Sequence, residues 1–316
     1  MHSYRAYGVG FHSVLPLPEL EPSKERADVE IQLGDLGETP PDIGSKYFCC
    51  WQSPDGTYLY WKDVGTFLVQ GGRKVTIDPQ TGVEDKRLRL ILLGAVFSIV
   101  LQQRGHLVFH ASALEINESA VIFVGNKGWG KSTLASMLHR RGHNFLADDV
   151  VAIDDRNDAR HLVIPAFPQI KLWSDAVSSL GDDPERFPTV SSVVDKRDCR
   201  LVDGYLNHPV PLRAIYVLGS SGHPAPEIVK LGAQESLIYL IAQSYNARWG
   251  KEMFAKESAL HLKRCGAIIR NIPVYRLARP RNLELLPLTA QMIEDHVHTA
   301  VPGASFNISR EAPEKE

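Results

Sequence analysis

Cysteine is scarce in this sequence. Only four of the 316 residues are cysteines, and no two of them form a CxxC pair. Cys49 and Cys50 are adjacent and could bridge only through a strained ring, whereas Cys199 and Cys265 lie far apart along the chain. This pattern argues against a disulfide framework and against a zinc site, and it predicts reduced thiols in a cytosolic protein.

The sequence also lacks an excess of charge of either sign and a long hydrophobic run. Its formal net charge of -2 gives no reason to expect nucleic-acid binding. The most apolar run, residues 90–101, is shorter than the roughly 20 residues that a membrane-spanning helix needs, so we expect a buried helix there. No apolar core follows the first residues, so we expect no signal peptide, no membrane insertion and a soluble, cytoplasmic protein.

The first 84 residues differ in pattern from the rest of the chain. Short alternating or aromatic-rich stretches are separated by turn clusters such as Ser53-Pro54-Asp55-Gly56. This spacing is typical of strands and turns, so residues 1–84 are predicted to form a small β-rich N-terminal module that includes irregular proline-containing segments. The predicted strands are residues 29–33, 47–52, 58–62, 66–69 and 74–77.

From residue 85 onward the pattern alternates between strands and helices, which indicates an α/β domain over residues 85–302. A tight turn at Asn117-Glu118 is expected to join two of the strands as a hairpin. Residues 303–316 are polar and are predicted to be a disordered tail. Strands are predicted at 107–116, 120–124, 144–153, 214–218 and 274–277, and helices at 85–103, 131–141, 233–242, 289–297 and over a stretch that ends at 266–270.

A glycine-rich loop carries the strongest motif in the chain. It matches the full GxxxxGK[ST] pattern, follows an apolar strand and precedes a helix, as a phosphate-binding loop requires. Glycines let successive backbone N–H groups surround phosphate oxygens, and the helix N-terminus favours negative charge. Lys131 can reach the β- and γ-phosphates of ATP, and the Ser132 hydroxyl can bind Mg²⁺. The predicted nucleotide-binding residues are Gly125, Asn126, Lys127, Gly128, Trp129, Gly130, Lys131, Ser132 and Thr133.

Two adjacent aspartates follow this loop closely. Asp148 and Asp149 end an apolar stretch 17 residues after Lys131, and the carboxyl end of such a strand lies near the phosphate site of an α/β sheet. Two neighbouring carboxylates raise each other's pKa, and Mg²⁺ and Lys131 would relieve that cost. One aspartate is expected to bind the metal and the other to accept a proton from an attacking hydroxyl. The plainer alternative is an acidic turn that leaves a strand.

His110 is predicted to lie in the middle of the strand that pairs with the loop-bearing strand. A single histidine in a strand is more often a core or edge residue than a functional one. If the neighbouring strand carries the phosphate loop, however, the imidazole could reach the aspartates or the γ-phosphate.

These elements together resemble the HPr serine kinase/phosphorylase family. His110, the loop from Gly125 to Thr133, Arg141-Gly142-His143 and Leu146-Ala147-Asp148-Asp149 agree with it in order and spacing over residues 108–153. The resemblance implies a catalytic fold of the HPr kinase and phosphoenolpyruvate carboxykinase type that uses ATP and Mg²⁺. It also implies that Lys131 and Ser132 hold phosphate and metal, that Asp149 with Asp148 serves as base and metal partner, and that His110 supports the pair.

Further segments are similar to the HPr-kinase-like proteins of lasso-peptide biosynthesis clusters. This resemblance implies a peptide or protein acceptor with a serine, and it favours a lasso precursor peptide over HPr, because the later family signature that handles HPr has no convincing copy here. HPr kinases form hexamers, so an oligomer is compatible with the resemblance. The segments are Leu15-Pro16-Leu17-Pro18-Glu19-Leu20, Lys171-Leu172-Trp173, Asp195-Lys196-Arg197, Pro211-Leu212-Arg213-Ala214-Ile215-Tyr216-Val217-Leu218 and Pro273-Val274-Tyr275-Arg276-Leu277.

Basic residues after the phosphate loop are candidates for contacts with phosphate or substrate. Lys196 and Arg197 follow a polar stretch and are predicted to lie on a mobile loop that closes over phosphate, although a solvated basic loop fits the pattern equally well. Further candidates of equal rank are Arg248, Lys251, Arg276, Arg279 and Arg281.

The leading hypothesis is therefore an ATP-dependent serine kinase. Three alternatives stay open on the sequence alone: a small-molecule kinase on the same scaffold, a nucleotide-binding regulator without phosphoryl transfer, and an ATPase.

Overall fold

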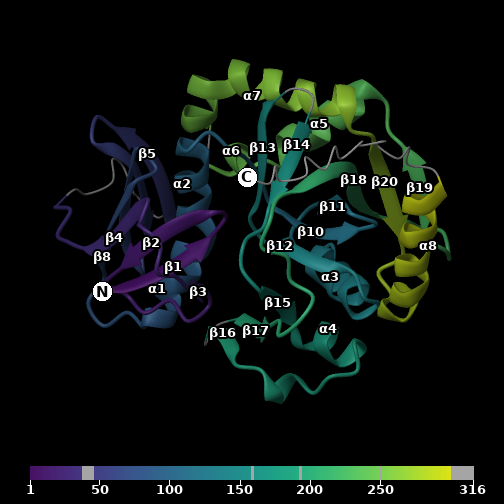
Figure 1. Cartoon of the computed structure of the whole chain (residues 1–316), viewed down its shortest axis with the longest axis horizontal. Helices are drawn as coiled ribbons and strands as arrows, with labels where there is room; N and C mark the ends of the chain where they lie inside the picture. The colour runs from purple at the N-terminus through teal and green to yellow at the C-terminus, as the bar shows by residue number, and fades with distance from the viewer. Residues whose placement is uncertain (38–45, 158–159, 192–193, 250, 300–316) are drawn as a thin grey trace, which may run out of the picture.

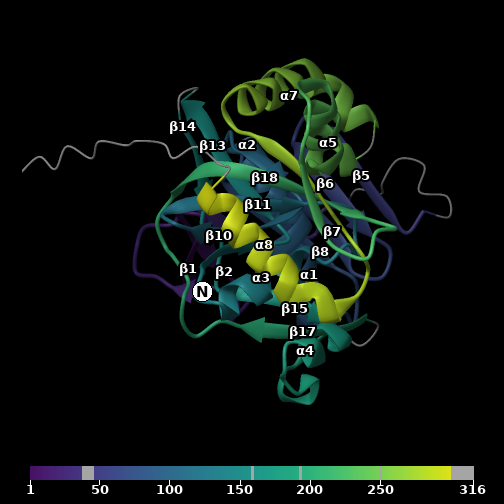
Figure 2. The same ribbon diagram turned by 90° about the vertical axis from the view of Figure 1, so that its right-hand side faces the viewer.

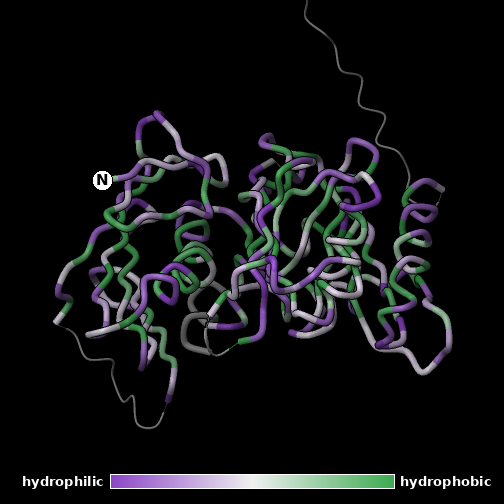
Figure 3. The backbone as a smooth tube through the Cα atoms, turned by 90° about the horizontal axis from the view of Figure 1, so that it is seen from below, coloured by the Kyte–Doolittle hydropathy of each residue, from purple (hydrophilic) through white to green (hydrophobic). Residues whose placement is uncertain are grey.

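The computed structural model describes residues 1–37, 46–157, 160–191, 194–249 and 251–299. They form two lobes that lie side by side, with a small third sheet below the second lobe (Figure 1). Seen from below, hydrophobic segments run through the middle of each lobe (Figure 3). The tail predicted at 303–316 and the predicted boundary at 302 lie outside the described residues.

The first lobe is an eight-stranded sheet with the order β3-β1-β2-β4-β8-β7-β6-β5. Strands were correctly predicted near β4 to β8, whereas β1 to β3 were missed. Strands β2, β4 and β8 are parallel to one another, and the other pairs are antiparallel. The strands are β1 (His2–Ala6), β2 (Val9–Ser13), β3 (Glu21–Pro22), β4 (Val29–Leu33), β5 (Phe48–Ser53), β6 (Gly56–Trp61), β7 (Gly65–Gln70) and β8 (Lys74–Pro79).

A helical stretch leads from the first lobe into the second. The predicted helix over 85–103 is confirmed as α1 (Asp85–Ile91), a π-helical turn η1 (Leu92–Val96) and α2 (Phe97–Gln103). Its apolar run is buried between the lobes, where Phe97 of α2 stacks on Phe11 of β2 with ring centroids 4.6 Å apart. Among the described residues, no helix is long and apolar enough to cross a membrane.

The second lobe is built on a nine-stranded mixed sheet. Its path is β12-β10-β11-β18-β14-β13-β9, and β20 pairs with β18 and with β19. Of the strands that the structure describes in this sheet, only β11, β18 and β20 run parallel as neighbours, so the α/β domain is not a doubly wound parallel sheet. The strands are β9 (Leu107–Phe109), β10 (Ala111–Ile116), β11 (Ser119–Val124), β12 (Asn144–Asp148), β13 (Val151–Asn157), β14 (Arg160–Ile164), β18 (Val210–Ser220), β19 (Glu227–Lys230) and β20 (Val274–Arg279).

Both faces of this sheet are covered, as the uninterrupted apolar sequence of β11 requires. Val121 and Phe123 face a core that includes α3 and α8, and α8 runs diagonally across this side of the molecule in Figure 2. Ile122 and Val124 face the opposite core, which includes residues of α2, α5, α6 and α7. The helices are α3 (Lys131–Arg140), α5 (Ala233–Gln243), α6 (Tyr245–Arg248), α7 (Lys251–Asn271) and α8 (Leu286–Thr299).

Two strands that were predicted as continuous are broken, and both breaks lie at the site. The stretch 107–116 divides at His110, because β9 pairs with β13 whereas β10 pairs with β11 and β12. The stretch 144–153 divides after Asp148, and Asp149 has a left-handed φ of +69° that a strand cannot include. The predicted hairpin is confirmed, since Asn117 and Glu118 have the positive φ values of a two-residue turn.

The third sheet has the order β15-β17-β16. Its strands lie between β14 and β18 along the chain, so the sheet is an insertion in the second lobe. The prediction that Lys196 and Arg197 lie on a mobile loop is wrong, because both belong to β17, where they pair with Trp173 and Leu172 of β15. Its elements are β15 (Gln169–Trp173), α4 (Ser174–Ser179), the short 3₁₀ turn η2 (Pro184–Arg186), β16 (Thr189–Ser191) and β17 (Val194–Arg200), and a further 3₁₀ turn, η3 (Leu283–Leu285), precedes α8.

Candidate functional site

The glycine loop joins β11 to α3, as its pattern predicts. Gly125, Gly128 and Gly130 have φ values of +152°, +81° and +78°, which other residues adopt only with strain. At Gly130 space is limiting as well, because a methyl group there would lie 2.2 Å from a guanidinium nitrogen of Arg279. Gly130 immediately precedes α3, whose N-terminus has no side-chain cap, so its first N–H groups are available to an anion.

Lys131 folds back over this loop. Its Nζ donates hydrogen bonds to the carbonyl oxygens of Gly125 at 2.8 Å and Asn126 at 3.3 Å. The side chain is buried, and burial lowers the pKa of Lys131 to about 8 in spite of the opposing charges of Asp148 and Asp149. A phosphate group beside it would favour the charged form.

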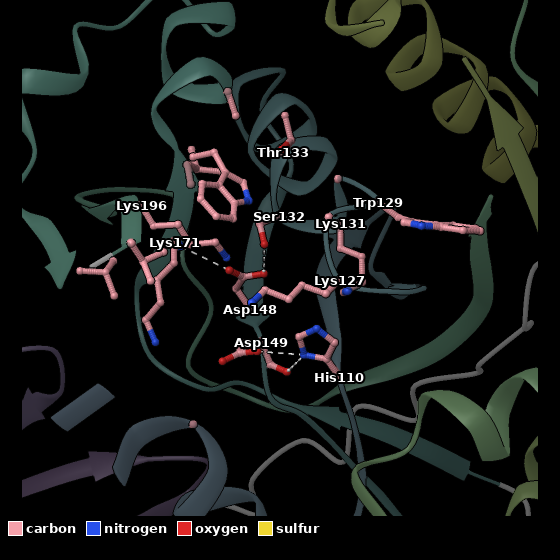
Figure 4. A pocket seen from close by; sticks show the side chains of 18 of the residues that line it. His110, Lys127, Trp129, Lys131, Ser132, Thr133, Asp148, Asp149, Lys171 and Lys196 are labelled. Carbon is pink, nitrogen blue, oxygen red and sulfur yellow. Dashed lines mark hydrogen bonds and ion pairs between the residues drawn. The ribbon is translucent and has the colours of Figure 1, made fainter. Parts of the chain in front are cut away.

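Asp148 points toward the start of α3 (Figure 4). Its Oδ1 accepts hydrogen bonds from the Ser132 hydroxyl at 2.9 Å and from the Ser112 hydroxyl at 2.6 Å. Its Oδ2 accepts one from the backbone N–H of Lys171 at 3.3 Å. Strands β11 and β12 both run antiparallel to β10, so their carboxyl ends meet at one edge of the sheet and bring Asp148 to the phosphate loop.

Asp149 points the other way, toward His110 (Figure 4). Nδ1 of His110 lies 2.9 Å from the Asp149 Oδ1 and 3.2 Å from the Asp149 carbonyl oxygen. Both partners are acceptors, so Nδ1 carries the proton. Burial raises the pKa of Asp149, but the hydrogen bond from His110 and the charges of His110, Lys171 and Arg248 outweigh it and hold the pKa well below its ordinary value. Asp149 is therefore a carboxylate at neutral pH.

A cavity of about 700 Å³ connects these groups. Lys127, Trp129 and Arg279 line it beside the phosphate loop, and Lys171, Lys196 and Arg248 line it near the aspartates. Aromatic side chains line another part of the wall, and two of them, Phe48 and Trp61, come from the first lobe, whereas Tyr245 and Trp249 come from the second lobe.

Not every predicted residue reaches this cavity. Arg197 lies outside the lining and binds Glu185 at 2.8 Å and the Ser174 hydroxyl at 2.9 Å. Asn126 accepts a hydrogen bond from Gln243 through its side chain. Lys196 does line the cavity and lies over the Trp173 ring at 5.4 Å.

Several lining residues were not identified from the sequence. Gly94 lies in the π-helical turn, and a methyl group there would be 3.4 Å from Asp149 Oδ2. In the sequence, the position of Gly94 inside an apolar helix was the only indication that another group lies close to this residue. Tyr245 donates to the Asp149 carbonyl oxygen at 3.4 Å, and nothing in its sequence context indicates that contact. Arg279, by contrast, is one of the basic candidates that were predicted with equal rank; it lines the cavity, is buried and donates to the Trp129 carbonyl oxygen at 3.1 Å.

The metal-binding capacity of the site is small. The described residues contain no group of three or more His, Cys, Asp or Glu side chains that could hold a metal ion. The Ser132 hydroxyl and the Asp148 carboxylate lie next to each other at the glycine loop and could serve as two oxygen ligands. This set fits Mg²⁺, which is commonly held by one or two protein ligands together with substrate phosphates and water.

Comparison with known proteins supports the resemblance to the HPr serine kinase/phosphorylase family in the part of the chain around the glycine loop. Residues 103–170 match the family model of the HPr Serine kinase C-terminal domain. This segment is HPr kinase-like. An HPr kinase/phosphorylase of Prosthecochloris aestuarii is 40% identical over 50 residues, which are 16% of this chain and 15% of the relative. One of Chlorobaculum tepidum is 36% identical over 55 residues, 17% of this chain and 16% of the relative.

The stretches of this chain that align with these curated relatives thus span about a sixth of the relatives' length. A solved structure of the Hpr(Ser) kinase/phosphatase from Coxiella burnetii is 16% identical, with a TM-score of 0.35, and covers 61% of this chain and 97% of its own.

Proposed function

We propose that this chain is an ATP-dependent serine kinase that transfers the γ-phosphate to a serine hydroxyl of a peptide or protein. The observation that carries the proposal is the arrangement of two aspartates with separate surroundings in one cavity. Asp148 binds Ser132 at the phosphate loop, and Asp149 binds His110 farther along the cavity. The HPr kinase-like match over residues 103–170 supports the same reaction class.

The nucleotide would bind through the glycine loop and Lys131. Backbone N–H groups at the start of α3 would receive the phosphate oxygens, and Lys131 would exchange its two loop carbonyl partners for phosphate. Arg279 stabilises the loop by donating a hydrogen bond to the Trp129 carbonyl oxygen. Ser132 and Asp148 would hold Mg²⁺, which supplies charge neutralisation on the phosphates.

Asp149 would act as the base for the acceptor hydroxyl. As the serine oxygen forms its bond to the γ-phosphorus and the bond to the β-phosphate oxygen breaks, Asp149 takes the hydroxyl proton and ADP leaves. The low pKa of Asp149 keeps it ionised but makes it a weak base, so the proton moves late, when the serine oxygen is already bonding to phosphorus. Lys171 and Arg248 add positive charge near this carboxylate.

The acceptor would lie between the two lobes. Phe48 and Trp61 bring apolar surface from the first lobe to the same cavity as Asp149 and pack against each other with centroids 4.6 Å apart. Phe48 also contacts Trp249 of the second lobe at 5.9 Å. We favour a peptide acceptor because aromatic side chains of both lobes line the cavity that holds Asp149, and a lasso precursor peptide over HPr because of the sequence segments similar to lasso-cluster kinases.

The test is transfer of label from γ-labelled ATP with Mg²⁺ to a serine-ended lasso precursor peptide and to HPr, each offered separately. Asp149→Asn serves as the matched variant, because asparagine has the same shape and tolerates a positive φ. We expect label on peptide serine, with a rate about 10²- to 10⁴-fold lower in Asp149→Asn and ATP binding retained. Label on HPr alone would reverse the preference between acceptors. ATP binding without transfer to either acceptor would refute the proposal in favour of a small-molecule kinase or a regulator.

A further inference from the structure

The tip of the first hairpin reaches the segment that follows Asp149. Strands β1 and β2 are joined by Tyr7 and Gly8, which have φ values of +54° and +67°. Tyr7 is only 3% exposed, and its hydroxyl donates a hydrogen bond of 3.0 Å to the carbonyl oxygen of Val150. Its backbone N–H donates to the Pro165 carbonyl oxygen at 3.1 Å. One residue of the first lobe is thus anchored twice in the second lobe.

Three donors from distant parts of the chain hold the backbone at Asp149 and Val150. His110 and Tyr245 both donate to the Asp149 carbonyl oxygen, at 3.2 and 3.4 Å, and Tyr7 donates to the next carbonyl oxygen. Burial raises the pKa values of Tyr7 and Tyr245 well above their ordinary range, so both hydroxyls keep their protons as donors. These contacts fix a residue whose left-handed φ is unfavourable for an aspartate.

The hydroxyl of Tyr7 is separable from the packing of its ring. The ring lies edge-on to Phe167, with centroids 6.3 Å apart and an interplanar angle of 85°. A phenylalanine would keep that contact and would lose only the hydrogen bond to Val150. Tyr4, on the same hairpin, is also buried, and its hydroxyl accepts a hydrogen bond of 2.9 Å from the Leu17 N–H, away from Asp149.

We propose that Tyr7 is a positioning residue for Asp149, so that the first lobe helps to set the geometry of phosphoryl transfer. This inference rests on the proposed function of Asp149. Tyr7 acts through the backbone: its hydrogen bond holds the Val150 carbonyl, which keeps the left-handed turn in place and directs the Asp149 carboxylate toward His110. The lobe that would bind the acceptor is thereby also the lobe that holds the base in position.

The experiment compares Tyr7→Phe with Tyr4→Phe in the full chain. We expect Tyr7→Phe to lower kcat about five- to tenfold, the effect of one lost hydrogen bond, with KM for ATP unchanged. Tyr4→Phe, which loses a comparable bond elsewhere, should leave kcat within about twofold of the wild type. In an Asp149→Asn background Tyr7→Phe should change the residual rate by less than about twofold, because the residue through which it acts is already disabled.

A second measurement is independent of transfer. The ring ¹⁵N signals of His110 report its pairing with Asp149, and we expect them to move in Tyr7→Phe and to stay in place in Tyr4→Phe. Equal kcat values for the two single variants, unchanged His110 signals, or a full Tyr7→Phe effect on top of Asp149→Asn would each overturn the inference. If the wild type transfers no phosphate, the proposed function fails, and the His110 signals still decide whether Tyr7 positions Asp149.

Discussion

Lys131 should destabilise the protein when no nucleotide is bound. Its ammonium group is buried under the phosphate loop, where two carbonyl oxygens are its hydrogen-bond partners. Burial lowers its pKa from an ordinary 10.5 to about 8, which means that the folded protein resists its protonation. A methionine of similar length removes the charge and keeps most of the packing. We therefore expect Lys131→Met to be more stable than the wild type at pH 7, although it should not bind ATP.

The size of this effect follows from the pKa. A lowering from 10.5 to about 8 is a change of about 300-fold in the ionisation constant and corresponds to about 3 kcal/mol. The two hydrogen bonds to carbonyl oxygens are lost in the variant and offset about 1 kcal/mol each. The net gain is therefore on the order of 1 kcal/mol at pH 7.

The stability difference between Lys131→Met and the wild type should depend on pH. Between pH 8 and 10.5 the unfolded chain holds a proton that folded Lys131 has lost, so the stability of the wild type rises with pH over that range. The advantage of Lys131→Met should thus be largest below pH 8 and should disappear by about pH 10. Urea unfolding at pH 7, 8.5 and 10 measures it. Lys127→Met is the matched control, since Lys127 lies exposed in the same loop. A Lys131→Met variant that is less stable than the wild type by the same amount at every pH would refute the reasoning.

Three further predictions concern the groups around Lys131 and Asp149. Gly130→Ala should weaken ADP binding at least about tenfold in calorimetry, more than Gly128→Ala, because both glycines have positive φ but only at Gly130 would the added methyl group, 2.2 Å from the Arg279 guanidinium, displace the side chain that donates to the Trp129 carbonyl oxygen; equal losses would show that this displacement is irrelevant. Arg279→Met should lower both the affinity for nucleotide and the free energy of unfolding, the latter by about 1 to 2 kcal/mol, because it leaves the Trp129 carbonyl oxygen without its donor, whereas Arg281→Met should lower at most the affinity; an unchanged free energy of unfolding in Arg279→Met would contradict this. His110→Ala removes the hydrogen bond and the charge interaction that hold the Asp149 pKa down, so that pKa should rise and transfer should fall more steeply in the variant than in the wild type as the pH drops from 7 to 5; parallel pH–rate profiles would argue against the pair.

The parts of the site that could be predicted from the sequence are those encoded locally. The glycine loop requires a strand before it and a helix after it within a few residues, and the structure has both. Asp148 could be placed because it ends an apolar strand 17 residues after Lys131, and the carboxyl end of such a strand lies near the glycine loop of an α/β sheet. The strands of the first lobe from β4 onward were recognisable from their own turns and alternation.

The parts that could not be predicted depend on contacts between distant segments. The breaks at His110 and Asp149 arise because each half of the stretch pairs with a different strand, which no local pattern reveals. The polar sequence around Lys196 predicts a loop. The residue lies in a strand because β17 pairs with β15, a segment more than twenty residues earlier in the chain. Tyr7 and Tyr245 are 238 positions apart in the sequence, yet they donate to the adjacent carbonyl oxygens of Val150 and Asp149.

The two lobes share one hydrophobic core, and this changes how the first lobe should be understood. Buried side chains of β2, β4 and β8 belong to the same cluster as those of α2, β9 and β11. A module that served only to recognise an acceptor could be joined by a linker, and no common core would be needed. Phosphoryl transfer, however, demands that the acceptor hydroxyl, the base and the phosphorus stay aligned, and a displacement of about 1 Å can cost about 100-fold in rate. A shared core keeps Phe48 and Trp61 in a fixed relation to Asp149, and the hydroxyl of Tyr7 extends the same coupling to the backbone beside that carboxylate.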